Sequence, residues 1–525
     1  MAALDKRKFF LQALLLTAVS LLLRTVGVSA QVYISARIGA EAVGVSSLIG
    51  SVGGFTVTLA LSGIGLGCTR LVSEGLGRRD AVFVHRTLRC SVVHALGFGT
   101  LAALLLFFGA DTIARLWLRD LRTVTSLRLM ALTLPFISLS SCLAGYFVAV
   151  RRVWKSACVQ VGEEIVRVLA TILLLSQLIS NGLEAALLAL ALANAIADIS
   201  SSLVLLFLFL FDRKAHLPLQ DQYKSSIGVS TVAKRLLSVT MPIATAAYAR
   251  SGLITLEHML IPVGLQRFGQ SHGAALADYG ALHSMALPVV LFPCALLTSF
   301  ASLLVPELTE AHVRGENDRI RAVMRRVFSL TLIFSIGVAG ILLFYSRELG
   351  LLLYGSEQAA LYIRVLAPLI PVMYMDSATD AMLKGLGQQV YSMKVNIADA
   401  SLSVLLVWLL LPLFGIWGYV ITIYFTELLN AALSIARLWQ ISGMKPSPRQ
   451  WIAKPLLSIV GATALSRLLM ALSPLLRGHG ITAAILVAHI LLSVILYCLF
   501  LFLLGALGKR DLAWMKGFIF SRTTP

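Results

Sequence analysis

The chain has 525 residues, of which 58% are hydrophobic and only 13% are charged, and its mean hydropathy is +0.87. A soluble protein of this length would need about a quarter of its residues charged to cover its surface. The composition therefore excludes an ordinary soluble globular protein and indicates that most of the surface faces lipid.

The net charge of +19 comes from 44 Lys and Arg residues against 25 Asp and Glu residues. The positive residues lie in short gaps between apolar segments, as expected when loops meet anionic lipid headgroups. We therefore expect membrane lipids as partners and no nucleic acid. The six cysteines are scattered without a C-x-x-C pair, so neither a disulfide framework nor a zinc site is predicted.

A membrane-spanning helix needs about twenty mostly apolar residues. The first apolar segment follows basic residues and superficially resembles a signal peptide, but Arg24 interrupts the expected cleavage region, so we predict an uncleaved helix. Kinks or unwound turns are expected near Pro242 and Pro288. The fold class is thus an all-α integral membrane protein with about fourteen transmembrane helices, predicted at 9–36, 43–69, 82–109, 124–150, 157–180, 184–211, 232–259, 275–304, 327–346, 359–384, 391–413, 416–440, 452–473 and 481–507.

The distribution of basic residues tests this number of helices. The two termini and the even-numbered gaps contain 31 Lys and Arg residues, whereas the opposite gaps contain 9. One missed or extra helix in the middle of the chain would scramble this bias. The pattern therefore predicts that both termini lie in the cytoplasm.

An internal repeat links the two halves of the chain. At an offset of 236 residues, Glu163 aligns with Asp399 and Asn194 aligns with Asn430. A repeat of six helices keeps its orientation, so the halves are predicted to be parallel copies. The predicted divisions are an N-terminal lobe of helices 1–6 (residues 1–225), a C-terminal lobe of helices 7–12 (226–442), and a segment with helices 13 and 14 and a cytoplasmic tail (443–525).

Arg24 lies within the first predicted helix, where an arginine costs about 2.5–3.5 kcal/mol and usually faces a cavity or a partner. Thr17, Ser20, Gly27 and Gln31 follow the same face at helical spacing. Such a stripe favours a water-filled cavity, with Arg24 and Gln31 as candidate substrate-binding residues. The alternative is that Arg24 pairs with a carboxylate for packing alone.

Arg250 aligns with Arg24 at a shorter offset of 226, and Glu257 lies two turns further along the same face. Two arginines converging from the two halves would suit a phosphate or pyrophosphate, because the guanidinium donates two parallel hydrogen bonds. Arg250 and Glu257 are therefore also candidate substrate-binding residues. The alternative is that Glu257 neutralises Arg250 structurally.

Acidic residues inside the second half form a second candidate site. Asp376 and Asp380 are four residues apart on one helix face, and Asn396 and Asp399 lie on the next predicted helix. Together they would form an oxygen-rich site for Na⁺ or H⁺ coupling. The alternative is that these carboxylates pair with basic groups such as Arg167, whose nearest predicted partner is Glu163, one turn earlier.

Several features of soluble enzymes are missing from the sequence. No Walker A motif, G-x-S-x-G motif or metal-spaced histidine cluster occurs, and the predicted loops are too short for an ATPase domain. We therefore expect a transporter that is not an enzyme and needs no cofactor. Gly63-x-Gly65-x-Gly67 follows no strand, so we interpret it as close helix packing or a bending point.

Several segments resemble the multidrug/oligosaccharidyl-lipid/polysaccharide exporter superfamily, and within it the stage V sporulation protein B branch of polysaccharide flippases. The resemblance covers about residues 6–440. It rests on seven segments, which are Arg24-Thr-Val-Gly-Val, Ala36-Arg-Ile-Gly-Ala-Glu-Ala-Val-Gly44, Gly63-Ile-Gly-Leu-Gly-Cys-Thr-Arg-Leu-Val-Ser-Glu74, Gly77-Arg-Arg-Asp80, Leu303-Leu-Val-Pro-Glu-Leu-Thr-Glu310, Arg314-Gly-Glu-Asn-Asp318 and Leu383-Lys-Gly-Leu-Gly-Gln388.

The resemblance implies two six-helix lobes around a central cavity and alternating access in the bacterial cytoplasmic membrane. It also implies a substrate built on undecaprenyl pyrophosphate, carrying a glycan or a peptidoglycan precursor, and a monomeric transporter. In the related lipid II flippases, cavity arginines hold the headgroup and helices 13 and 14 help to form a groove for the lipid tail. Arg24 matches such an arginine, but the second predicted helix has none before Arg70.

The alternative function is a cation-coupled multidrug exporter of the same superfamily. Paired arginines and two additional helices favour the flippase, because cationic drugs suit an acidic, aromatic-lined cavity. A membrane scaffold needs no polar stripe through a helix, and a membrane glycosyltransferase needs a large catalytic loop, which the sequence lacks.

Overall fold

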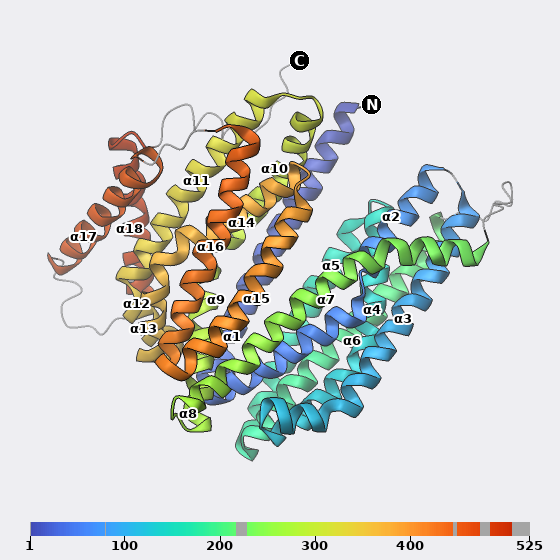
Figure 1. Ribbon diagram of the computed structural model, residues 1–525, viewed down its shortest axis with the longest axis horizontal. Coiled ribbons are helices and arrows are strands. Elements are labelled where there is room, and N and C mark those ends of the chain that lie inside the picture. The colour runs from blue at the N-terminus through green and yellow to red at the C-terminus, as the bar shows by residue number, and fades with distance from the viewer. Residues whose placement is uncertain (1, 79, 217–227, 445–448, 473–482, 507–525) are drawn as a thin grey trace. The chain divides into compact units, whose positions relative to one another are not determined.

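The computed structural model describes the whole chain except residues 1, 79, 217–227, 445–448, 473–482 and 507–525. Side chains are also left undescribed at 2–18, 20–21, 213–216, 298–307, 449 and 470–472. Every regular element in the described part is a helix (Figure 1). This confirms the predicted all-α membrane fold.

Apolar side chains and good helix formers dominate the long elements, and glycines in left-handed conformations end many of them. The first half contains α1 (Ala2–Leu61), α2 (Ile64–Gly77), α3 (Ala81–Thr112), η1 (Ile113–Leu118), η2 (Leu121–Thr123), α4 (Val124–Ala149), α5 (Val153–Leu178), η3 (Ile179–Asn181), α6 (Leu183–His216), α7 (Val229–Arg267), α8 (His272–Tyr279) and η4 (Gly280–Ala286). The second half contains α9 (Leu287–Leu291), α10 (Cys294–Val313), α11 (Asn317–Phe344), α12 (Ser346–Tyr354), α13 (Glu357–Leu366), η5 (Ala367–Leu369), α14 (Ile370–Gly385), α15 (Gln389–Phe414), α16 (Ile416–Ser442), η6 (Arg449–Ala453), α17 (Lys454–Leu472) and α18 (Ala483–Leu503).

Eleven segments of the described residues are long and apolar enough to cross a membrane. The first predicted span and most of the second fall on α1, which bends at Gly39, and the end of the second falls on α2. The fifth and seventh predicted spans form the helices α5 and α7, which are not among the eleven. The fourteen predicted spans are therefore compatible with the observed helices.

The second predicted span is interrupted inside the membrane. After a bend at Gly39, α1 ends at Leu61, and Ser62 (φ 44°) and Gly63 (φ 71°) adopt left-handed conformations before α2 begins. The Ser62 hydroxyl lies 2.5 Å from His94 Nε2, and the Tyr248 hydroxyl donates to the Leu59 carbonyl at 3.3 Å. The glycine-rich sequence is thus a bending point, as predicted.

The chain forms two compact units. Unit 1 comprises residues 1–280 and 400–419, and unit 2 comprises 281–399 and 420–525. Both α7 and α8 therefore group with the first six predicted helices, whereas the sequence repeat divides the chain at residue 225. The division of the chain at residue 225 is based on the internal repeat in the sequence, and it stays a prediction.

Unit 1 is held together by an apolar core and one buried ionic network. Tyr146 and Phe83 are almost fully buried between α2, α3, α4 and α6. Near the end of α6, the buried carboxylate of Asp212 accepts hydrogen bonds from the Tyr146 hydroxyl at 3.0 Å, from Lys155 Nζ at 2.6 Å and from Arg152. These contacts fix the connection between α4 and α5 against α6.

Unit 2 attaches α17 and α18 to α11 by close packing. The Tyr497 ring lies against Gly337, where an added Cβ would come within 2.6 Å of it, and its hydroxyl donates to the Ile333 carbonyl at 2.7 Å. Ile459 of α17 fits against Gly340 in the same way. Glycines on α11 thus create the space into which the two C-terminal helices pack.

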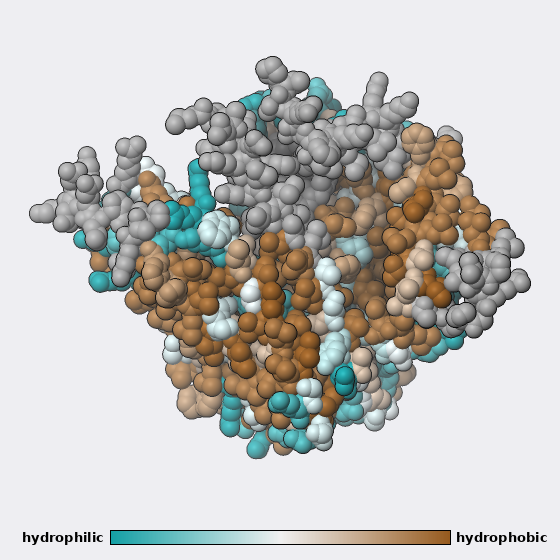
Figure 2. Space-filling model, turned by 180° about the vertical axis from the view of Figure 1, so that it is seen from behind, coloured by the Kyte–Doolittle hydropathy of each residue, from teal (hydrophilic) through white to brown (hydrophobic). Residues whose placement is uncertain are grey.

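Large apolar side chains cover much of the outer surface, as Figure 2 shows for one face. Phe108 on α3 and Leu503 on α18 are among the most exposed. A soluble protein rarely exposes continuous apolar surface on this scale. The surface is therefore that of a multi-pass membrane protein.

Candidate functional site

Four ionisable side chains meet in unit 1, and we call them the α5–α6 cluster: Glu163, Glu164, Arg167 and Asp198. Arg167 Nη2 lies 2.5 Å from Glu163 Oε1 and 3.2 Å from Asp198 Oδ1, and Nη1 lies 2.6 Å from Glu164 Oε2. The pairing of Arg167 with Glu163 follows the sequence prediction. Three carboxylates surround one guanidinium, which leaves a formal surplus of two negative charges.

The α5–α6 cluster is only partly buried. Its side chains are 16–30% exposed, although Arg167 lies in the middle of α5 and Asp198 in the middle of α6. Charged groups at this depth avoid lipid and face protein or water-filled space. We therefore expect the cluster to face polar space in unit 1.

The predicted polar stripe of α1 runs beside this cluster. The Glu164 carboxylate lies 3.7 Å from the position that a Cβ on Gly27 would occupy, one turn from Arg24. Arg24 and Gln31 are both half-buried, and each has an interaction partner within the fold. The side chains of Thr17 and Ser20 lie outside those that the structure describes.

Arg250 and Glu257 both lie on α7 in unit 1. Arg250 is exposed, and Glu257 has an interaction partner within the fold. Glu257 is half-buried and acts electrostatically on the buried hydroxyls of Tyr279 and Tyr419. No contact in the structure tests the predicted convergence of Arg24 and Arg250, which stays a prediction.

The four candidate coupling residues of unit 2 fall into two groups. In the first group, Asp380 pairs with Lys384 Nζ at 2.6 Å and accepts a hydrogen bond from the Ser392 hydroxyl. Asn396 donates to the Ser392 carbonyl at 2.9 Å. Ser392 thus connects Asp380 with Asn396.

The second group, which we call the Glu427 cluster, combines Asp376, Asp399, Glu427 and Asn430. Asn430 Nδ2 lies 3.4 Å from Asp376 Oδ2, and Asp376 and Asp399 both act electrostatically on Glu427. Carboxylates from α14, α15 and α16 therefore approach one another inside unit 2. Within the described residues, no group of three His, Cys, Asp or Glu side chains has the arrangement of a metal site.

Sequence reasoning did not include Glu427, Asn430, Lys384 or Ser392 among the candidate site residues. Glu427 and Asn430 are three residues apart on one face of α16, and Asn430 belongs to the internal repeat. This spacing, together with the place of Asn430 in the repeat, is the sequence signal that indicates a polar site on α16. Lys384 and Ser392 gave none, because they lie near the predicted ends of their helices.

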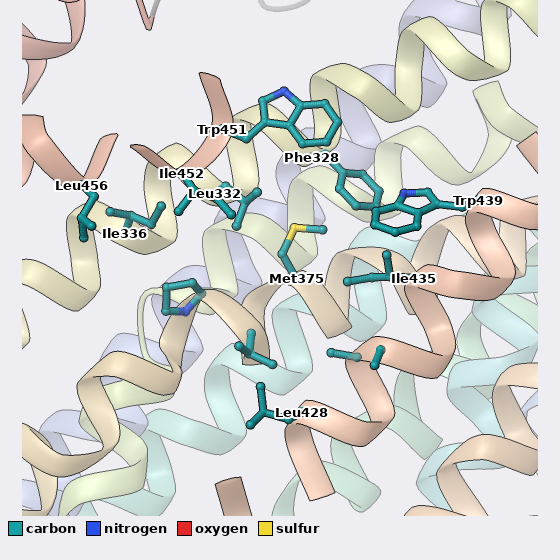
Figure 3. A pocket seen from close by; sticks show the side chains of 14 residues that line it. Phe328, Leu332, Ile336, Met375, Leu428, Ile435, Trp439, Trp451, Ile452 and Leu456 are labelled. Atoms are coloured by element: carbon teal, nitrogen blue, oxygen red, sulfur yellow. The ribbon is translucent and has the colours of Figure 1, made fainter. Parts of the chain in front are cut away.

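An apolar cavity of about 640 Å³ lies in unit 2 between α11, α14, α16 and the start of α17. Phe328, Trp439 and Trp451 gather along one side of it, and Met375 points into its middle (Figure 3). All fourteen lining residues are apolar or aromatic. The cavity therefore suits a hydrocarbon chain better than a polar ligand.

Charged groups at membrane depth, a spanning helix broken inside the membrane, and many apolar helices together define a multi-pass membrane transporter. The family model described as MatE matches residues 17–173 and 265–409, which is more than half of the chain. The protein belongs to the MatE family.

Similar proteins agree with this assignment. Stage V sporulation protein B of Bacillus subtilis (strain 168) is 26% identical over 424 residues, covering 80% of this chain and 81% of that protein. The inward-facing structure of a multidrug resistance MATE family transporter of the MOP superfamily has a TM-score of 0.64 at 14% identity and covers 81% of this chain and 98% of its own. The lipid II flippase MurJ in an inward closed conformation has a TM-score of 0.63 at 14% identity and covers 93% of this chain and 98% of its own. The resemblance noted in the sequence is confirmed.

Proposed function

We propose that this transporter moves a lipid-linked glycan or peptidoglycan precursor, anchored on undecaprenyl pyrophosphate, across the membrane by alternating access. The polar headgroup would pass through hydrated space while the polyprenyl tail stays in an apolar environment. Stage V sporulation protein B, a relative that covers 80% of this chain, supports a role in sporulation.

The observation that carries the proposal is the apolar cavity of unit 2. Its wall includes Trp451, Ile452 and Leu456, which belong to the segment after the sequence repeat. A polyprenyl tail is a long hydrocarbon chain and gains free energy from burial in such a space. The solved lipid II flippase also covers more of this chain than the multidrug transporter does.

Arg24 is the residue that we expect to hold the pyrophosphate, with Gln31 and Arg250 as further donors and Glu257 beside them. A guanidinium is permanently charged and binds phosphate oxygens in pairs. Arg24 lies one turn from Gly27, where the carboxylate of Glu164 approaches α1. Headgroup release would then depend on competition between the phosphate and these carboxylates.

We further propose that Na⁺ or H⁺ couples transport through the Glu427 cluster, rather than through all four acidic and amide residues suggested by the sequence. The ionisable groups that act on Glu427 are the two carboxylates Asp376 and Asp399. Carboxylates held together repel unless a proton or a cation joins them. Asp380 is less suited to this role because Lys384 already pairs with it.

The proposal includes the setting of the transporter. From the family resemblance we infer a monomer in the bacterial cytoplasmic membrane. The excess of basic residues in alternate gaps supports both termini in the cytoplasm. The partners are the lipid-linked substrate and membrane lipids, and no enzymatic activity is required.

The test is headgroup translocation in proteoliposomes with a fluorescent polyprenyl-pyrophosphate glycan. Arg24→Ala and Arg250→Ala should reduce protein-dependent flipping about tenfold or more, because each removes a charged donor to phosphate. Arg347→Ala is the control, since Arg347 is exposed and pairs with Glu357 at 3.0 Å. Absence of flipping by well-folded wild type with several glycans would refute the proposal.

A second pair of variants tests the apolar cavity. Ala432→Phe would fill part of it, whereas Ala436→Phe, one turn later on α16, adds the same ring outside the lining. Flipping should fall only for Ala432→Phe. Equal flipping by both variants would remove the tail-binding argument.

The second candidate function is multidrug export coupled to a cation. The acidic surplus of the α5–α6 cluster favours it, because carboxylates attract cationic drugs. Export of a fluorescent cationic dye by wild type, lost in Asp198→Asn, together with no flipping, would establish this function instead.

A further inference from the structure

Arg467 on α17 is an arginine within a predicted span that the proposed function does not use. Its neighbourhood, which we call the Tyr345 cluster, comprises Tyr345, Ser466, Arg467, His489 and Ser493. The Tyr345 hydroxyl lies 3.0 Å from Ser493 Oγ and 3.4 Å from Ser466 Oγ. Hydrogen bonds thus tie α17 and α18 to the end of α11.

The Arg467 guanidinium is held in place but keeps most of its donors. It donates to the Phe344 carbonyl at the C-terminus of α11 and lies 5.5 Å from the Phe344 ring centre and 5.8 Å from the Tyr345 ring centre. A guanidinium has five N–H donors. Among the described residues, no carboxylate lies within ion-pair distance of Arg467.

The His489 imidazole provides a further nitrogen group near the Arg467 guanidinium. Its ring centre lies 6.2 Å from that of Tyr345, so the Tyr345 ring contacts both the imidazole and the guanidinium. His489 Nε2 is shielded from solvent and has no hydrogen-bond partner in the described part of the chain. Arg467 and Glu348 both act electrostatically on this imidazole.

The surroundings of the Tyr345 cluster face the lipid phase. Leu468, next to Arg467, is 56% exposed, and Leu491, two residues after His489, is 57% exposed. Near the end of a spanning helix, an arginine extends its charged group towards the headgroup region. The acceptor available there is lipid phosphate, whose oxygens match the planar guanidinium.

We propose that Arg467 and His489 form a binding site for the phosphate of a membrane lipid at the end of α17 and α18 that packs against Tyr345. Two guanidinium N–H groups bind the phosphate oxygens, and His489 Nε2, which rotation of the imidazole brings to the surface, donates a third hydrogen bond. The site is independent of the proposed transport function. It assigns α17 and α18 a lipid contact of their own. This contact lies at the opposite end of α17 from Lys454, the basic residue at its N-terminus.

The test uses the full-length protein, purified in detergent and analysed by native mass spectrometry with added phosphatidylglycerol or undecaprenyl phosphate. Wild type should retain a bound lipid, Arg467→Gln should lower its occupancy about tenfold, and His489→Gln should lower it less. Arg347→Gln is the matched control, because this exposed arginine is already paired with Glu357. It should retain the lipid as wild type does.

Competition between the two lipids identifies the source of the phosphate. Displacement of phosphatidylglycerol by equimolar undecaprenyl phosphate assigns the site to the polyprenyl lipid, and its persistence assigns the site to the phospholipid. Arg467→Lys keeps the charge without the paired donors and should bind with intermediate occupancy, which tests the site even if Arg467→Gln unfolds. Unchanged lipid retention in Arg467→Lys and His489→Gln would overturn the proposal.

Discussion

Each of the two units contains a cluster of acidic side chains. The two clusters include positions that the sequence repeat aligns, but they differ in whether an arginine accompanies the carboxylates. In unit 1, Glu163 belongs to the α5–α6 cluster, where Arg167 contacts all three carboxylates. In unit 2, Asp399 occupies the aligned position. The residue aligned with Arg167 is Ser403, which groups with unit 1. The Glu427 cluster therefore brings carboxylates together without the arginine of its counterpart.

This difference separates a structural role for charge from a coupling role. An arginine built into a cluster is a permanent counter-ion, so the α5–α6 cluster is neutralised in part whatever the pH or salt concentration. Carboxylates that gather around another carboxylate bind protons or cations more readily. Variants in the two clusters should consequently affect different measurements.

The largest expected effect is on the folding of unit 1. Arg167→Met leaves three carboxylates without their shared counter-ion inside the membrane. Loss of one partner from a fully buried ion pair destabilises a protein by about 3–5 kcal/mol, and for this partly buried cluster we expect about 1–3 kcal/mol. The melting temperature and the yield of monodisperse protein should both fall sharply, as measured by fluorescence-detected size-exclusion chromatography.

The control for Arg167→Met removes the acids as well. In a variant that combines Arg167→Met with Glu163→Gln, Glu164→Gln and Asp198→Asn, no unpaired charge remains, so much of the lost stability should return. Equal instability of the single and the combined variant would show that packing of the Arg167 side chain, rather than its charge, holds α5 and α6 together.

Glu427→Gln in unit 2 should change the free energy of unfolding less than Arg167→Met does. Its effect should be specific to transport. The substitution removes one of three neighbouring carboxylates and should leave the melting temperature unchanged or raised. Flipping in proteoliposomes should fall about tenfold, within the usual range of coupling energies, and lose its response to an imposed Na⁺ or proton gradient. Asp318→Asn, at a fully exposed acid of the same unit, is the control.

A Glu427→Gln variant that transports at the wild-type rate and still responds to the gradient would place coupling elsewhere. The difference between the α5–α6 cluster and the Glu427 cluster would then concern helix packing and not ion coupling.

The smallest effect is expected for Asp380→Asn. Its partner Lys384 is 54% exposed and can return to water when the pair is broken. Partly exposed ion pairs contribute about 1 kcal/mol or less to stability. Thermal unfolding should change little and transport less than in Glu427→Gln, whereas a larger transport loss would restore Asp380 to the coupling site.

Much of the fold follows from the sequence, because hydropathy and helix length respond to the same bilayer thickness. The pairing of Arg167 with Glu163 is also predictable, since both lie on one helix at a spacing of four residues. The contact of Arg167 with Asp198 is not, because it depends on how α6 packs against α5. Local spacing predicts contacts within a helix and leaves contacts between helices undetermined.

The Glu427 cluster shows the same limit more clearly. Its three carboxylates come from α14, α15 and α16, and hydropathy alone fixes neither the rotation of each helix nor its depth. The sequence therefore grouped Asp376 with Asp380 by spacing, whereas packing turns Asp380 towards Lys384 and Ser392. Side-chain partners inside a membrane protein are decided by helix packing.

The break between α1 and α2 has a consequence for how the protein is made. Backbone groups at a helix interruption within a bilayer need partners from elsewhere, since no water is available to them. Here the Tyr248 hydroxyl donates to the Leu59 carbonyl, 189 residues earlier in the chain, while His94 bonds to the Ser62 side chain. The second membrane crossing therefore reaches its final form only after α7 has left the ribosome and entered the bilayer.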